Sequence, residues 1–125
     1  MSPKTIPPGL RVRCGRARIR PGAEQEAERW MAMLNDRSSE AVQTLERERM
    51  AIELVFRERD DDGDWIVWVL IQGDGGASIA DSPFPIDRDH AAFGQRCLLP
   101  GRPEAEPQVM LMPALVRDAV LGWAL

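Results

Sequence analysis

The chain has 125 residues, of which 44% are hydrophobic and 29% are charged, and its formal net charge is −4 at pH 7. This length supports one domain with one modest core, and the composition excludes a wholly disordered chain. The acidic balance argues against a nucleic-acid partner, because nucleic-acid binding normally needs a basic field.

The first nine residues contain three prolines, and we expect them to form a flexible lead-in to a single domain over residues 10–125. They lack the apolar core of a signal peptide. No apolar run in the chain approaches the roughly 18 residues that a membrane helix needs. We therefore expect a cytoplasmic protein with no membrane partner.

Two cysteines and one histidine are the only residues of their kinds. In the cytoplasm, Cys14 and Cys97 are expected to be free thiols. Neither lies in a CxxC or CxxH pattern, and one histidine cannot supply a typical structural zinc site. The sequence therefore predicts no metal and no cofactor.

The first predicted elements are a strand over 10–19 and a helix over 23–48. Apolar residues in the second segment recur at the spacing of one helix face. The pairs at 35–36 and 38–39 are polar, so two interpretations stay open: one long helix, or a helix that bends or divides there.

Strands over 51–59 and 65–72 alternate apolar and polar residues around an acidic turn, which predicts a hairpin. If Arg59 pairs with Trp65, one face is strongly apolar and the other is mixed, but a slip of one residue would exchange the faces of one strand. The apolar face in this register comprises Ile52, Leu54, Phe56, Ile66, Trp68 and Leu70. A sheet with helices on one face and apolar residues on the other favours a homodimer.

A glycine-rich loop over 73–78 is followed by a helix from about 86 to 97, a short strand over 109–113 and a tail helix over 115–123. The resulting order predicts an α+β fold with the ferredoxin-like β-α-β-β-α-β arrangement. It would have a four-stranded antiparallel sheet, two helices on one face, and a short C-terminal helix.

Several segments in this order resemble an uncharacterised family of small bacterial proteins, a domain of unknown function. The segments are "RARIRPG" (16–22), "LERERMAIELVFRE" (45–58), "DGDWIVWVLIQGDGG" (62–76), "DSPFPIDRDHAAFGQRC" (81–97) and "PQVMLMPALVR" (107–117). The resemblance implies the dimeric α+β barrel superfamily, in which two ferredoxin-like subunits pair their sheets. That superfamily includes mutarotases and cofactor-independent monooxygenases, so it leaves the chemistry open.

The histidine, His90, shares one helical stripe with Ile86, Phe93 and Cys97, which places it on the face toward the sheet. Asp87, one turn earlier, could orient the imidazole or raise its pKa. The alternative is a buried histidine bonded to Asp87 or to a carbonyl, beside a cysteine that acts as a small apolar residue. Cys97 lies about 10 Å along the helix from His90, too far for direct activation.

A pocket over an aromatic floor is predicted near this helix, because the register above places Glu58 on the face of Trp68. Glu58 could complement His90 in acid–base chemistry. The alternatives are an exposed charge at the strand end for Glu58 and a core residue for Trp68. Arg16 or Arg18 would contact an anionic ligand if their face of the first strand is the one that meets the helices, which the sequence leaves open. The candidate catalytic residues are therefore His90, Asp87 and Glu58, and the candidate ligand-binding residues are Arg16, Arg18, Trp68 and Cys14.

Three functions follow as hypotheses. The chain is a dimeric small-molecule enzyme of the mutarotase or monooxygenase kind, a non-catalytic module that binds a small molecule in the same pocket, or a structural or interaction dimer without a ligand.

Overall fold

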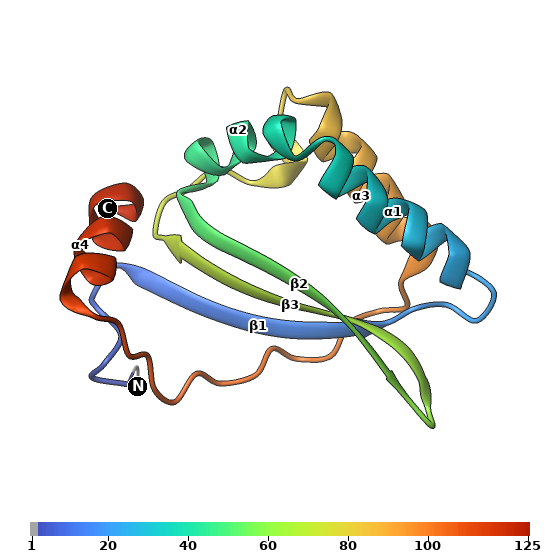
Figure 1. Cartoon of the computed structure of the whole chain (residues 1–125), viewed down its shortest axis with the longest axis horizontal. Coiled ribbons are helices and arrows are strands. Elements are labelled where there is room, and N and C mark those ends of the chain that lie inside the picture. The colour runs from blue at the N-terminus through green and yellow to red at the C-terminus, as the bar shows by residue number, and fades with distance from the viewer. Residues whose placement is uncertain (1–2) are drawn as a thin grey trace.

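A computed structural model of the chain describes residues 3–125 and has an α+β fold, as the sequence predicts (Figure 1). Its elements in chain order are β1 (Leu10–Arg18), α1 (Glu24–Asp36), α2 (Ser38–Glu48), β2 (Met50–Asp60), β3 (Gly63–Gly73), the short 3-10 helix η1 (Ile79–Asp81), α3 (Pro85–Cys97) and α4 (Ala114–Ala124). None of the helices in residues 3–125 combines the length and apolar character that crossing a bilayer requires.

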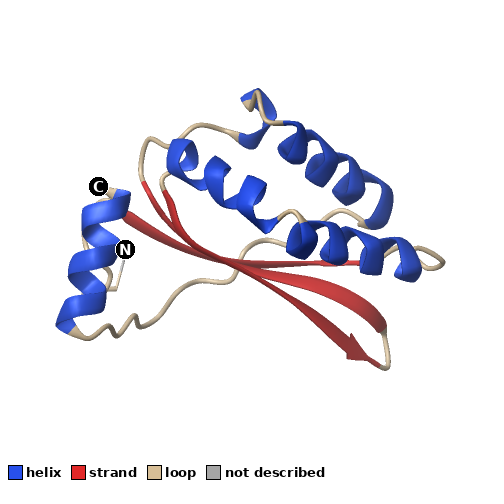
Figure 2. Ribbon diagram, turned by 45° about the horizontal axis from the view of Figure 1, so that its top comes forward, coloured by secondary structure: helices blue, strands red, loops and turns tan. Residues whose placement is uncertain are grey.

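The sheet is antiparallel, with the strand order β1-β3-β2. The helices α1, α2 and α3 cover one face of it, while α4 lies at one end of the sheet, near the start of β1 (Figures 1 and 2). We call the side away from α1, α2 and α3 the open face. The predicted four-stranded arrangement is not confirmed, since the sheet has three strands and residues 109–113 form none of them.

An irregular segment, residues 98–113, replaces the expected fourth strand, and we call it the arm. It runs along β1 (Figure 1) and makes isolated contacts there, including hydrogen bonds from Leu99 N to Arg18 O (2.9 Å) and from Ala105 N to Cys14 O (2.8 Å). The arm contains four prolines, which have no amide hydrogen to donate to a strand ladder. They are Pro100, Pro103, Pro107 and Pro113. These prolines disfavour a continuous strand ladder over the length of the arm.

The long helical segment divides at Arg37, which has φ −106° and ψ 32° and separates α1 from α2. This is the second of the two interpretations that the polar pairs left open. The break lets α2 leave the line of α1 (Figure 2). Three helices, rather than the two that were predicted, consequently cover the sheet.

The predicted hairpin register is wrong by one residue. Trp65 pairs with Glu58 rather than with Arg59, because the strands are joined by a two-residue turn between Asp60 and Gly63. The Asp60 carboxylate accepts hydrogen bonds from the backbone N–H groups of Asp62 (2.9 Å) and Gly63 (3.1 Å), which fixes this short turn. Since side chains alternate between faces, the slip moves the β2 side chains from Ile52 to Asp60 to the opposite face relative to β3.

Two apolar clusters hold these elements together. One lies between the helices and the sheet and contains Ile19, Ala27, Trp30, Ile66 and Cys97. The second joins α4 to the sheet end and includes Ile6 and Leu10. The lead-in predicted to be flexible over residues 1–9 lies partly outside the described residues; within the described part, Ile6 is buried in the second cluster.

Candidate functional site

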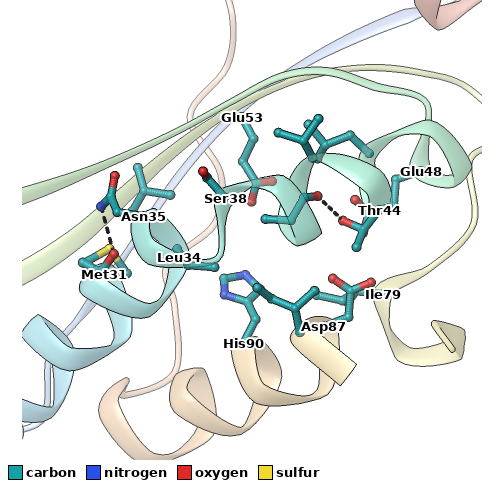
Figure 3. A pocket seen from close by; sticks show the side chains of 15 residues that line it. Met31, Leu34, Asn35, Ser38, Thr44, Glu48, Glu53, Ile79, Asp87 and His90 are labelled. Carbon is teal, nitrogen blue, oxygen red and sulfur yellow. Dashed lines mark hydrogen bonds between the residues drawn. The ribbon is translucent and has the colours of Figure 1, made fainter. Parts of the chain in front are cut away.

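A cavity lies between the helix-covered face of the sheet and the helices α2 and α3. It consists of two adjoining hollows of about 300 and about 590 Å³, sizes typical of small-molecule sites. Both hollows are lined by Glu48, Glu53, Val55, Ile79 and His90. Figure 3 shows the smaller hollow, where Asp87 and His90 point from α3 toward the space that Glu53 enters from β2.

His90 is held in place by Trp30 of α1. The indole Nε1–H of Trp30 donates a 2.8 Å hydrogen bond to Nδ1 of His90, and the ring centroids lie 5.4 Å apart. Because an indole nitrogen only donates, Nδ1 must be unprotonated, and the neutral ring carries its proton on Nε2. Burial lowers the pKa of His90, and the charge of Asp87 opposes this shift only in part. His90 is therefore a neutral hydrogen-bond donor at the cavity.

Three carboxylates approach the same cavity from three elements. Asp87 on α3 and Glu48 at the end of α2 are both buried, and the Oδ2 atom of Asp87 has no hydrogen-bond partner. Burial raises the pKa of Glu48 to about 7, with further contributions from Asp87 and Glu53. The Glu53 side chain is exposed, yet it lines the cavity, and burial by surrounding protein together with Asp87 raises its pKa.

Trp68 forms a wall of the larger hollow, and it owes its position to a glycine. Gly15 lies opposite Trp68 in the sheet, and a Cβ atom on Gly15 would lie 2.4 Å from the Trp68 ring. The indole therefore lies directly over the backbone of β1. No other residue at position 15 would leave room for it there.

The structure brings together only part of the predicted site. His90 and Asp87 line the smaller hollow, and His90 and Trp68 line the larger one. The other four candidates lie on the open face of the sheet, because the true register and the alternation along β1 place them there. They are Glu58, Cys14, Arg16 and Arg18.

On the open face, the side chains of Arg16 and Glu58 form an ion pair with each other. Arg16 Nη1 donates a 2.9 Å hydrogen bond to Glu58 Oε1, and the guanidinium lies 4.1 Å from the centroid of the Trp65 ring. Both partners are substantially exposed. The sheet separates this pair from His90, so the structure does not support Glu58 as the complement of His90.

The two cysteines lie in different surroundings. Cys97 is fully buried in the cluster beneath the helices, and burial raises the pKa of its thiol, which disfavours the reactive thiolate. Cys14 is half-buried on the open face, where its carbonyl accepts the hydrogen bond from the arm. Neither thiol lines the cavity.

Sequence reasoning missed Glu48, Glu53 and Trp30 as site residues. A signal for Glu48 existed, since it continues the apolar stripe of α2 that runs through Ala41 and Leu45 at i+4 and i+7. A carboxylate on an apolar stripe is unusual and marks a candidate site. Glu53 carried no such signal, because its face depends on the register.

In residues 3–125, no group of three or more histidine, cysteine or acidic side chains is arranged to hold a metal ion. Comparison with the curated proteins gave no match, and comparison with the solved structures gave none. Residues 10–118 match a family of unknown function, DUF6176. This match spans most of the chain, and the protein belongs to the DUF6176 family.

Proposed function

We propose that this protein binds a small molecule in the cavity between the sheet and the helices α2 and α3. One observation carries the proposal: His90, fixed by Trp30 through Nδ1, lines a cavity that buried carboxylates also line. Apolar walls with a few converging polar groups are the usual composition of a ligand site. A solid core at the same place would have no reason to keep Asp87 unpartnered.

Acid–base chemistry at this cavity would use Glu48 rather than His90. Trp30 occupies Nδ1 of His90, so that nitrogen cannot accept a proton without breaking the hydrogen bond. Glu48, with a pKa of about 7, exchanges a proton near neutral pH, as a general acid or base must. This assignment favours proton transfer of the mutarotase or cofactor-independent monooxygenase kind, with His90 orienting the substrate.

We also propose a ferredoxin-like ancestry for the fold. The strand order β1-β3-β2, with the arm running antiparallel beside β1, matches a ferredoxin-like sheet whose fourth strand has lost its regular pairing. This relation supports the dimeric α+β barrel superfamily.

A thermal-shift screen of a metabolite panel tests the binding proposal. We expect at least one compound to raise the melting temperature of the wild type, and to raise that of His90→Ala much less. Mass spectrometry of the incubated compound then separates the two functions, since a binding module returns it unchanged and an enzyme converts it. Glu46→Gln, an exposed change on α2, serves as control. A panel without any stabilising compound would contradict the proposal.

A second candidate function is an interaction dimer that pairs the open faces of two copies. Leu54 and Phe56 are 46% and 52% exposed there. The nearby charges of Arg16 and Glu58 are already paired within one chain. Such a face can meet its own copy around a two-fold axis without like-charge repulsion, which favours a second copy as the occupant. The oligomeric state in solution tests this candidate.

A further inference from the structure

The carboxylates at the cavity have no basic partner. Glu48 and Asp87 are only 8% and 5% exposed. Within residues 3–125, neither they nor Glu53 form an ion pair. Asp87 Oδ2, buried at the smaller hollow, accepts no hydrogen bond. Because burial removes the hydration of a carboxylate, an unpaired one is costly to keep.

The basic side chains near the cavity are already engaged. Arg13 reaches the larger hollow, but it donates two hydrogen bonds to Glu104 (2.9 and 2.8 Å). Arg11 pairs with Asp74 at 3.3 Å. Arg47 donates to backbone carbonyl groups in the segment that follows β3. Neutral His90 adds no positive charge at pH 7. The charge of Arg47 favours ionised Glu48 from a distance, but no basic side chain pairs with Glu48, Asp87 or Glu53, so a cationic ligand would supply the contact that they lack.

The surroundings also indicate what kind of cation fits. The acidic side chains are too dispersed to form a metal site in the described part of the chain. A group with several N–H donors can instead reach separate carboxylates. The rest of the smaller hollow is largely apolar, with Leu34, Val42, Leu45, Val55, Ile79 and Ile86 in its walls. We infer that the cavity binds an organic cation, an ammonium or guanidinium group on an apolar body, with Asp87 and Glu48 as its ionic partners.

This inference rests on the proposed function and adds the chemical class of the ligand. It also predicts that the affinity for the ligand depends on pH. Glu48 faces Asp87 and His90 on α3 and Glu53 on β2, with Arg47 beside it in α2. A bound cation favours the ionised form of Glu48, so binding releases protons near pH 7 and is tighter at pH 8 than at pH 6.

Benzylamine is a suitable probe, because its ring matches the apolar walls and its ammonium group can reach the carboxylates. Benzyl alcohol and benzoate provide a neutral and an anionic probe of similar shape. We expect isothermal titration calorimetry at pH 8 to show affinity for benzylamine about tenfold or more above that for either control, as for a charge-assisted contact in a partly buried site. Repeating the titration in buffers of different ionisation enthalpy measures the proton release.

Variants connect the binding to the named carboxylates. Asp87→Asn and Glu48→Gln should each weaken benzylamine binding about tenfold or more, because each removes one ionic partner. Glu46→Gln removes the same charge from the exposed side of α2 and should leave the affinity within about twofold. Thermal unfolding of each variant verifies its fold, and the two site variants provide independent readings.

The outcomes separate the two proposals. If benzyl alcohol or benzoate binds at this cavity as tightly as benzylamine, the cation inference fails while the proposed function stands. The inference also fails if the site variants bind benzylamine like the wild type. If no probe of any charge binds, and no metabolite stabilises the protein, both proposals fail.

Discussion

The indole N–H of Trp30 donates to Nδ1 of His90 at 2.8 Å, and this contact determines which nitrogen of the neutral ring carries the proton. Burial lowers the pKa of His90. A donor on Nδ1 also favours the neutral ring, so we expect Trp30→Phe, which frees Nδ1 to accept a proton, to raise this pKa in part. The chain has one histidine, so its proton NMR resonances are identified without ambiguity. Trp123→Phe, whose indole donates to Met50 O at the other core cluster, is the control. An unchanged pKa in Trp30→Phe would exclude this role for the hydrogen bond.

Glu48→Gln should stabilise the unliganded protein in a pH-dependent way. The pKa of Glu48 rises from an ordinary 4.5 to about 7 on folding, so its favourable contribution is complete below pH 4.5 and is lost as the pH rises through 7. We expect glutamine, which carries no charge, to increase the free energy of unfolding by about 2 kcal/mol at pH 8 and by much less at pH 5. Urea denaturation at both pH values measures this difference. An equal gain at the two pH values would show that the charge of Glu48 is not its source.

Gly15→Ala should disturb the larger hollow. The added Cβ would lie 2.4 Å from the Trp68 ring, so the indole must move. We expect a loss of about 1–3 kcal/mol of stability, typical of overpacking, and a change in tryptophan fluorescence. Gly122→Ala is the matched control, because no atom lies within 4 Å of its new Cβ and the position is helical. A Gly15→Ala protein as stable as the wild type would contradict the close packing of Trp68 on β1.

Phe56→Asp should keep the open faces of two copies apart. A carboxylate in place of this 52% exposed ring would repel its two-fold equivalent and remove apolar contact area. We expect analytical ultracentrifugation to give a dimer for the wild type and a monomer for the variant. Gln43→Asp on the exposed side of α2 should remain dimeric. A monomeric wild type would remove the interaction-dimer candidate.

Glu58→Gln should affect neither the cavity nor the stability strongly. Its carboxylate pairs with Arg16 at the surface of the opposite face, and exposed pairs contribute about 0–1 kcal/mol. We expect unchanged benzylamine affinity and a shift in unfolding free energy of less than about 1 kcal/mol. Calorimetry and urea denaturation test both expectations. Reduced binding in this variant would reopen the catalytic role that the predicted register suggests for Glu58.

The sequence predicts the helices and strands of this fold better than it predicts which faces meet. Apolar spacing identified α3 and the side of it that carries His90, because that pattern depends only on neighbours along one helix. The β2–β3 register depended on the length of one acidic turn. The Asp60 carboxylate shortens that turn, and a one-residue error was enough to assign Glu58 to the wrong side of the sheet.

Of the residues that line the cavity, the sequence pointed to Asp87 and His90, which share one helix, and to Trp68 on β3. Glu48 and Trp30 come from other helices, and their approach to α3 depends on the break at Arg37. Long-range packing of this kind leaves little trace in a single sequence.

The proline-rich arm beside β1 also affects how copies of the chain can associate. An unpaired strand edge is a template on which a strand of another chain can pair. Pro100, Pro103 and Pro107 deprive the arm of donors at intervals, so its outer side cannot continue the hydrogen-bond ladder. The arm therefore caps this edge of the sheet and protects it against edge-to-edge aggregation.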